Sequence, residues 1–340
     1  ITDSECPFSS SPRANVSKEI FNAFRKEGFW VGAYFSKPDW HSEYYWWPYF
    51  ATPDRNVNYD IKKYPERWEK FIQFTHSQVD ELVSEYGKID ILWLDGGWVR
   101  PLTKEEITRA INSPDYKFSR IQSQDIRMDE LVRKVRQKQP GMIVVDRAVP
   151  GKNQNYLTPE NVVPDEPLLC PWESCIISGG GWSWVPDAKY MSARKAIHLL
   201  VDIVAKGGNL LLNIAPGPDG TWDKGAYELL QEIGRWMKTN QEAIYNTRPK
   251  APYKEGKVCL TRRQDKTIYA VYLADENEKR MPSEISLGFF SPPKGAEISL
   301  LGAREKLEWE PAGKGLLVKI PEKYQNNPPC SFAWTLKISL

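Results

Sequence analysis

The chain has few histidines and no paired-cysteine motif, and both shortages limit the chemistry that it can perform. Its 340 residues include three histidines and no His-Glu-x-x-His sequence. The cysteines are odd in number and scattered: Cys6, Cys170, Cys175, Cys259 and Cys330. We therefore expect no metal ion and no other cofactor, and no disulfide framework, while a single disulfide bridge remains an open alternative.

The sequence also lacks a strong net charge and a long apolar segment. The formal net charge is +2, without a stripe of Lys and Arg between aromatic residues, so we expect no nucleic-acid partner. No apolar run has the length that a membrane span needs. No signal peptide is visible, and the chain begins Ile-Thr-Asp-Ser-Glu-Cys without an initiator Met, so the start shown need not be the start of the gene.

Aromatic residues, by contrast, are abundant. The chain contains 14 Trp, 16 Tyr and 12 Phe. Aromatic rings fill protein cores, and they also stack on the apolar faces of sugars. The excess therefore favours a carbohydrate ligand, although core filling is the commoner use of any single ring.

Helical and strand patterns alternate from about residue 14 to residue 239, which predicts an α/β fold with parallel strands and right-handed crossovers. No Gly-x-Gly-x-x-Gly or Walker loop follows a strand, and polar residues end several strands, so a barrel rim is favoured over an open sheet. Beyond residue 249 short alternating strands predict an antiparallel β-sandwich. We predict a TIM-like (β/α)8-type barrel in residues 1–249 and a β-sandwich domain in residues 250–340.

The strand that ends at Asp95 is the first candidate for a catalytic site. Its apolar run stops at a carboxylate and two glycines, as in a buried parallel strand that delivers an acid to the edge of a sheet. Alternation along the strand places Ile89 and Trp93 on the face of Asp95, opposite Leu92 and Leu94. The alternative is that Asp95 only caps the following turn.

Seven sequence blocks follow one another along the chain: Tyr-Phe-Ser-Lys-Pro-Asp-Trp (34–40), Trp-Leu-Asp-Gly-Gly (93–97), Asp-Arg (146–147), Thr-Pro-Glu (158–160), Pro-Trp-Glu (171–173), Gly-Gly-Asn-Leu-Leu-Leu-Asn-Ile (207–214) and Glu-Ala-Ile-Tyr (242–245). In this order they resemble the blocks of glycoside hydrolase family 29, the α-L-fucosidases. The resemblance covers about residues 15–250. The C-terminal part is similar to the sandwich of that family in position and pattern.

The resemblance implies a retaining exo-glycosidase that releases α-L-fucose by double displacement, with Asp95 as the nucleophile. Retention also needs a protonated carboxyl, and the two groups lie about 5–5.5 Å apart in retaining enzymes. Glu160 is our first choice as this acid, because Pro159 stiffens a loop that can bring it over the rim. Glu173 follows Trp172 near a predicted strand end, and it is either the alternative acid or a sugar contact.

Five further residues are candidates for substrate binding: Tyr34, Trp40, Trp93, Arg147 and Trp182. Arg147 can keep Asp95 ionised and hold a sugar hydroxyl, and its alternative role is a salt bridge with Asp146 or a surface carboxylate. The alternative role of Trp93 is core packing. The expected partner is a fucosylated oligosaccharide or glycoconjugate, and the resemblance implies an extracytoplasmic location, either periplasmic, secreted or lysosomal.

One departure from the family pattern concerns the first strands of the barrel. The blocks Phe-x-His-Trp-Gly and His-His-Asp-Gly-Phe, which end two earlier strands in the family, do not occur here. We therefore expect an N-terminal barrel segment beyond this sequence, which itself supplies about six of the eight strands. Two other functions remain open: a catalytically silent fucose- or glycan-binding relative, and the same retaining machinery acting on a related sugar such as a galactoside.

Overall fold

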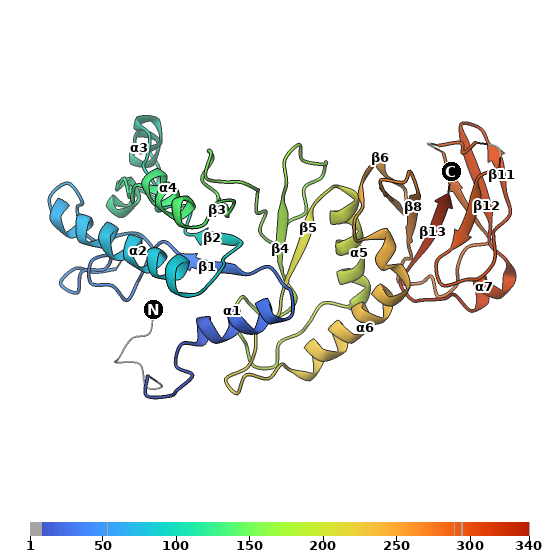
Figure 1. Cartoon of the computed structure of the whole chain (residues 1–340). Coiled ribbons are helices and arrows are strands. Elements are labelled where there is room, and N and C mark those ends of the chain that lie inside the picture. Colours follow the sequence, from blue (N-terminus) through green and yellow to red (C-terminus); the bar gives the residue numbers. More distant parts are fainter. Residues whose placement is uncertain (1–8, 53, 289, 294, 340) are drawn as a thin grey trace. The chain divides into compact units, whose positions relative to one another are not determined.

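The computed structural model describes residues 9–52, 54–288, 290–293 and 295–339 (Figure 1). Cys6 and Phe289, the last residue of a predicted strand, lie outside these ranges. The chain divides into two compact units, residues 1–157 and 158–340, and each is described by itself.

The first unit is built on a parallel sheet in the order β1-β2-β3. Its strands are β1 (Gly32–Ser36), β2 (Ile91–Asp95) and β3 (Ile143–Asp146). Its helices are α1 (Val16–Lys26), α2 (Pro65–Glu85), α3 (Lys104–Ile111), the 3-10 helix η1 (Phe118–Ile121) and α4 (Met128–Lys138). Ser36 pairs with Asp95, and Leu94 pairs with Asp146, so the carboxyl ends of the three strands meet at one edge.

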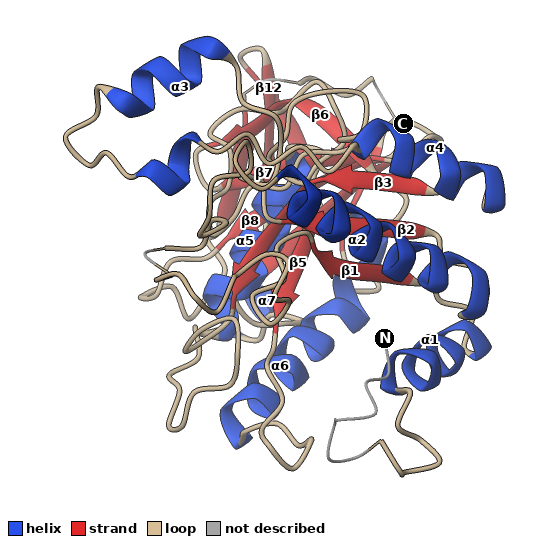
Figure 2. Ribbon diagram, turned by 90° about the vertical axis from the view of Figure 1, so that its left-hand side faces the viewer, coloured by secondary structure: helices blue, strands red, loops and turns tan. Residues whose placement is uncertain are grey.

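Side-chain alternation along β2 decides which face of this sheet is covered by helices. Leu92 and Leu94 are fully buried, in one cluster with apolar residues of α2 and α4. Figure 2 shows these two helices lying side by side over strands β1–β3. Trp93 and Asp95 point to the other face, as predicted. Ile89 differs from the prediction: it precedes the strand, where alternation does not apply, and it packs on the helix side.

The second unit begins with a parallel pair, β4 (Glu173–Ile177) and β5 (Asn209–Asn213), which is followed by α5 (Ala193–Ala205) and α6 (Lys224–Asn240) in the chain order β4-α5-β5-α6. The predicted strand near residues 168–175 is therefore displaced. It starts at Glu173, so this residue opens the strand and does not end it. A further parallel bridge joins Glu160 to Cys175, in the middle of β4.

The C-terminal part of this unit consists of a five-stranded sheet, β10-β13-β8-β7-β6, and a three-stranded sheet, β11-β12-β9, both antiparallel. Its strands are β6 (Arg248–Glu255), β7 (Val258–Arg262), β8 (Ile268–Leu273), β9 (Glu284–Leu287), β10 (Glu297–Leu300), β11 (Trp309–Ala312), β12 (Gly315–Lys319) and β13 (Ala333–Ser339). Two short helices, η2 (Gln241–Ala243) and α7 (Glu322–Asn326), complete it.

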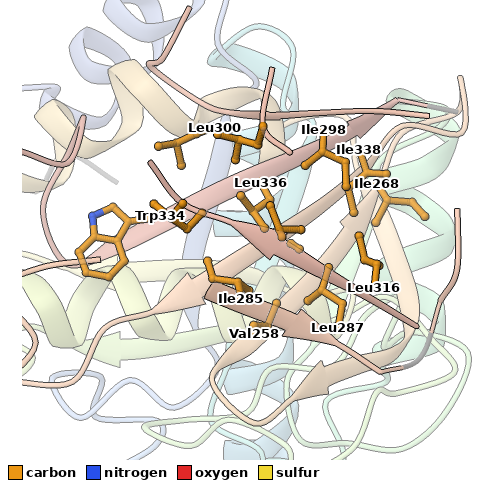
Figure 3. Close-up of a cluster of buried hydrophobic side chains, with 14 of the residues drawn as sticks. Val258, Ile268, Ile285, Leu287, Ile298, Leu300, Leu316, Trp334, Leu336 and Ile338 are labelled. Atoms are coloured by element: carbon orange, nitrogen blue, oxygen red, sulfur yellow. The ribbon is translucent and has the colours of Figure 1, made fainter. Parts of the chain in front are cut away.

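Apolar side chains of both sheets meet in one buried cluster (Figure 3). Leu336 and Ile338 enter it from the five-stranded sheet, and Leu287 and Leu316 from the three-stranded sheet. A second cluster joins the same five-stranded sheet to α5 and α6 through residues such as Ile197. Burial of apolar surface on both sides thus holds this sheet against its neighbours within the unit.

The chain therefore has an α/β domain followed by an antiparallel β domain. The expected barrel is only partly present: the parallel strands form sheets of three and two strands, and the described residues contain no closed barrel. None of the helices in the described ranges has both the length and the apolar character that crossing a membrane requires.

Candidate active site

The three parallel strands of the first unit place three functional groups around one carboxylate. Arg147, which directly follows β3, donates a hydrogen bond from Nη1 to Asp95 Oδ1 at 2.9 Å. Tyr34, on β1, donates from its hydroxyl to Asp95 Oδ2 at 2.8 Å. The side chains of Asp95 and Arg147 are 27% and 15% exposed, so the ion pair is partly buried. The prediction that Arg147 serves as a cation near Asp95 agrees with this geometry.

These contacts control the ionisation of Asp95. Burial by itself would raise the pKa of this carboxyl. The hydrogen bonds from Arg147, the Gly96 backbone and Tyr34 outweigh that effect and hold the pKa of Asp95 below its usual value. Burial raises the pKa of Tyr34, and the neighbouring Asp95 raises it further, so the phenol stays protonated and remains a donor at neutral pH.

Trp93 forms an aromatic surface beside the carboxylate. Its ring stacks on Tyr34 with the centroids 5.4 Å apart and the planes at 26°. The guanidinium of Arg147 lies 5.2 Å from the Trp93 ring centroid. The indole Nε1 is buried and finds no hydrogen-bond partner among the described residues. A buried polar group of this kind usually has a partner, and a sugar hydroxyl is suited to this one.

The glycines after Asp95 let the backbone pass close to its neighbours. A Cβ on Gly96 would lie 2.4 Å from Pro38 Cδ, and the residue has φ +89°. A Cβ on Gly97 would lie 2.9 Å from the carbonyl oxygen of Arg147. Both glycines are thus required where the loops after β1 and β3 approach β2.

A buried ion pair lies behind this site, and our sequence analysis missed it. Lys37 Nζ is 2.5 Å from Asp146 Oδ1. Asp146 therefore pairs with Lys37, while Arg147 pairs with Asp95, so a salt bridge between Arg147 and its neighbour Asp146 is not the arrangement found. The signal in the sequence was a lysine at the end of one strand and an aspartate at the end of another.

Trp40 does not join the groups that contact Asp95. Its ring stacks on Trp46 at a centroid distance of 5.4 Å and an angle of 8°, and its Nε1 donates to the carbonyl of Arg55 at 3.2 Å. It is nevertheless 52% exposed, so one part of the ring remains accessible to a ligand.

The second unit brings Glu160 and Trp182 together. The indole Nε1 of Trp182 donates to Glu160 Oε1 at 3.2 Å, and Asn213, the last residue of β5, donates to the Trp182 carbonyl at 3.4 Å. Glu160 therefore reaches toward the carboxyl ends of β4 and β5. Trp182 is 43% exposed there.

Glu173 lies at the opposite end of β4 from the one predicted. It pairs with Asn209, the first residue of β5, whereas Glu160 is level with Cys175. Strands rise about 3.3 Å per residue, so Glu160 is about 6–7 Å nearer the carboxyl edge of this pair. Among the described residues, no group of three or more His, Cys, Asp or Glu side chains is placed to hold a metal ion.

Two family models match the chain in succession. The first, described as Alpha-L-fucosidase, matches residues 6–242. The chain belongs to the alpha-L-fucosidase family. The second model, described as Alpha-L-fucosidase C-terminal domain, matches residues 253–339. The α-L-fucosidases of glycoside hydrolase family 29 are retaining glycoside hydrolases, and the resemblance read from the seven sequence blocks is confirmed.

Relatives in this family are longer than the chain. It is 28% identical to the tissue alpha-L-fucosidase of Bos taurus over 343 residues, which cover 96% of the chain and 65% of the bovine protein. It is 27% identical to the alpha-L-fucosidase of Branchiostoma floridae over 271 residues, which cover 77% of the chain and 56% of that protein. The chain thus spans less than two thirds of either relative.

Solved structures of fucosidases share the fold. Alpha-L-fucosidase isoenzyme 1 from Paenibacillus thiaminolyticus superposes with a TM-score of 0.73 at 24% identity, covering 95% of the chain and 75% of the isoenzyme. A Thermotoga maritima alpha-fucosidase in complex with a mechanism-based inhibitor gives 0.71 at 22% identity, covering 98% and 70%. The α/β domain and the following antiparallel domain are therefore arranged along the chain as in fucosidases.

Proposed function

We propose that the chain is a retaining exo-α-L-fucosidase that releases α-L-fucose from fucosylated oligosaccharides or glycoconjugates. The observation that carries this proposal is the Asp95 carboxylate between Arg147 and Tyr34, with its pKa held below the usual value. A nucleophilic carboxylate must be ionised, and its attack needs it beside a bound sugar ring. The stacked rings of Tyr34 and Trp93 are suited to that sugar, and membership of the fucosidase family supports fucose.

The proposed reaction has two displacements. In the first, a carboxylate oxygen of Asp95 attacks the anomeric carbon, the glycosidic C–O bond breaks, and the leaving oxygen takes a proton from Glu160. In the second, Glu160 removes a proton from water, the water oxygen attacks the same carbon, and the ester bond to Asp95 breaks. A covalent intermediate trapped in an alpha-L-fucosidase of Bacteroides thetaiotaomicron supports the same route here.

Glu160 remains our choice for the acid. It reaches the carboxyl end of its strand pair beside the exposed Trp182, whereas Glu173 stands at the amino end. Functional groups of parallel α/β folds gather at the carboxyl ends of strands. Asp95, Arg147 and Asn213 share such positions, which also supports a (β/α)8-type barrel as the architecture to which these strands belong. The boundary at residue 249 stays a prediction.

Replacement of Asp95 by Asn tests the function. A neutral amide of nearly the same shape cannot form the glycosyl ester, so turnover of an aryl α-L-fucoside should fall at least about a thousandfold while the fold is kept. Asp80→Asn, on the exposed surface of α2, is the matched control. A loss below about tenfold would remove Asp95 from the role of nucleophile. Fucose binding without turnover in the unaltered chain would identify a silent relative, and hydrolysis of an aryl galactoside alone would identify a related sugar.

A further inference from the structure

A second hollow lies at the same edge of the first unit's sheet as Asp95. Its volume is about 520 Å³, and we call it the Arg55 hollow. Arg55 comes from the loop after β1, whereas Trp98 and Arg100 come from the loop after β2. Both loops leave the carboxyl edge, and Trp98 stands three residues beyond Asp95. The hollow therefore adjoins the Asp95 site.

Electrostatic effects link the hollow to that site. Burial lowers the pKa of Lys37 and raises that of Asp146, and the charge of Arg100 on the wall of the hollow lowers the pKa of both. Lys37 also responds to the charge of Asp95. A charged ligand in the hollow would therefore lie within electrostatic range of the groups around Asp95.

The backbone of Arg55 is held firmly in place. Its carbonyl oxygen accepts hydrogen bonds from Trp40 Nε1 at 3.2 Å, from Trp98 Nε1 at 3.2 Å and from Tyr45 Oη at 3.0 Å. Tyr45 is completely buried, and its hydroxyl also donates to Gln124. Three rings from two loops thus fix the position from which the Arg55 side chain extends.

The guanidinium of Arg55 is preorganised but unused. It lies 4.1 Å from the centroid of the Trp98 ring, and within the described part of the chain it forms neither a hydrogen bond nor an ion pair. A planar guanidinium binds carboxylate and tetrahedral oxyanions through two parallel N–H donors. A cation already held against an aromatic ring loses little freedom on binding such a group.

The carboxylates near the hollow are already occupied. Asp54 Oδ1 accepts from the backbone and side-chain nitrogens of Asn56, and its Oδ2 accepts from Ser119. Glu106 forms a bidentate pair with Arg100, at 2.6 and 3.0 Å. Neither acid is therefore available to neutralise Arg55.

Cations outnumber these two acids. Arg120 lies 3.6 Å from Asp54 with its side chain 48% exposed. Burial alone would raise the pKa of Asp54, but the hydrogen bonds from Asn56 and Ser119 and the charge of Lys117 bring it below its usual value. Arg55, Arg100, Arg120 and Lys117 thus face two carboxylates, which leaves the surroundings of the hollow positive.

We propose that the Arg55 hollow binds an anionic group, a sulfate ester or a carboxylate, on the sugar to which fucose is attached. This inference rests on the proposed fucosidase function for the position of that sugar. It makes Arg55 a specificity-determining residue on the leaving-group side of the substrate. Fucosides of acidic glycans are then better substrates than their neutral counterparts.

The test compares three disaccharides: α-L-fucosyl-N-acetylglucosamine, its 6-O-sulfate, and the corresponding uronic acid. We expect kcat/KM to be about tenfold higher for an acidic disaccharide than for the neutral one, as one charge-assisted contact provides. Arg55→Met keeps the packing on Trp98 and the carbonyl contacts, and it should reduce this preference to less than about twofold. Arg133→Met, on the exposed surface of α4, should keep the preference.

A binding measurement separates this inference from the fucosidase proposal. Calorimetry with N-acetylglucosamine 6-O-sulfate, and with the matching uronic acid, reports the hollow without any turnover, and Arg55→Met should weaken binding about tenfold. Sulfate alone or carboxylate alone as the preferred group would identify the source of the charge. Equal turnover of neutral and acidic disaccharides, with unaltered binding in Arg55→Met, overturns the inference and leaves the fucosidase proposal intact. Arg55-dependent binding without turnover of any fucoside overturns only the fucosidase proposal.

Discussion

Lys37 Nζ lies 2.5 Å from Asp146 Oδ1, and the two side chains are 0% and 5% exposed. Burial lowers the pKa of Lys37 and raises that of Asp146, because water no longer stabilises either charge, and the ion pair opposes both effects. Lys37 directly follows β1, and its backbone N–H donates to the carbonyl of Asp95. The pair therefore ties the ends of β1 and β3 together around the residue between them.

Lys37→Met should destabilise the first unit strongly. Removal of one partner leaves Asp146 buried without its cation, which costs about 3–5 kcal/mol. Lys134→Met is the matched control, since its pair with Glu130 is on the surface and contributes about 0–1 kcal/mol. Urea unfolding of the two variants measures the difference. Equal losses of unfolding free energy would show that the buried pair has no special role.

Gly96→Ala should be more harmful than an alanine at a glycine with similar backbone angles. Gly141 has φ +84° and no atom within 4 Å of the place that a Cβ would take, so Gly141→Ala reports backbone strain alone, about 1–2 kcal/mol. Gly96 adds the close approach to Pro38, so we expect about 1–3 kcal/mol more and a fall in kcat. Unfolding curves and aryl fucoside turnover check this. Identical losses at the two sites would contradict it.

Tyr34→Phe should move the acid limb of the kcat/KM profile to higher pH. The hydroxyl stabilises the charged form of Asp95, so its removal raises the pKa of that carboxyl and protonation begins at a higher pH. At neutral pH we expect a loss of about tenfold, as for one hydrogen bond to a charged group. Tyr49→Phe, at an 87% exposed position, is the control. An unmoved acid limb in Tyr34→Phe would separate Tyr34 from the ionisation of Asp95.

Glu160→Ala and Glu173→Ala decide which residue is the acid. Loss of the acid lowers the rate by about 10²–10⁴-fold for substrates with poor leaving groups and much less for activated aryl fucosides. Added azide should restore deglycosylation in that variant, because azide needs no general base. We expect both signs in Glu160→Ala. Leaving-group dependence and azide rescue in Glu173→Ala alone would show that the acid is assigned to the wrong residue.

The helices and most strands could be predicted because their patterns are local. Val79, Leu82 and Val83 recur at helical spacing, and all three are buried in α2. β6 was missed because it is an edge strand that contains prolines and exposed charged residues, with no apolar alternation to mark it. Glu173 was placed at the wrong end of β4 because a short apolar run does not define where pairing starts.

The sequence by itself determined that Asp95 and Arg147 follow buried strands, since an apolar run that stops at a charged residue is visible without coordinates. Only the tertiary structure decided their partners. Arg147 bonds to Asp95, and the adjacent Asp146 bonds to Lys37, since consecutive side chains leave a strand end in different directions. Strand order and register set which groups meet, and these depend on packing between segments that are far apart in the chain.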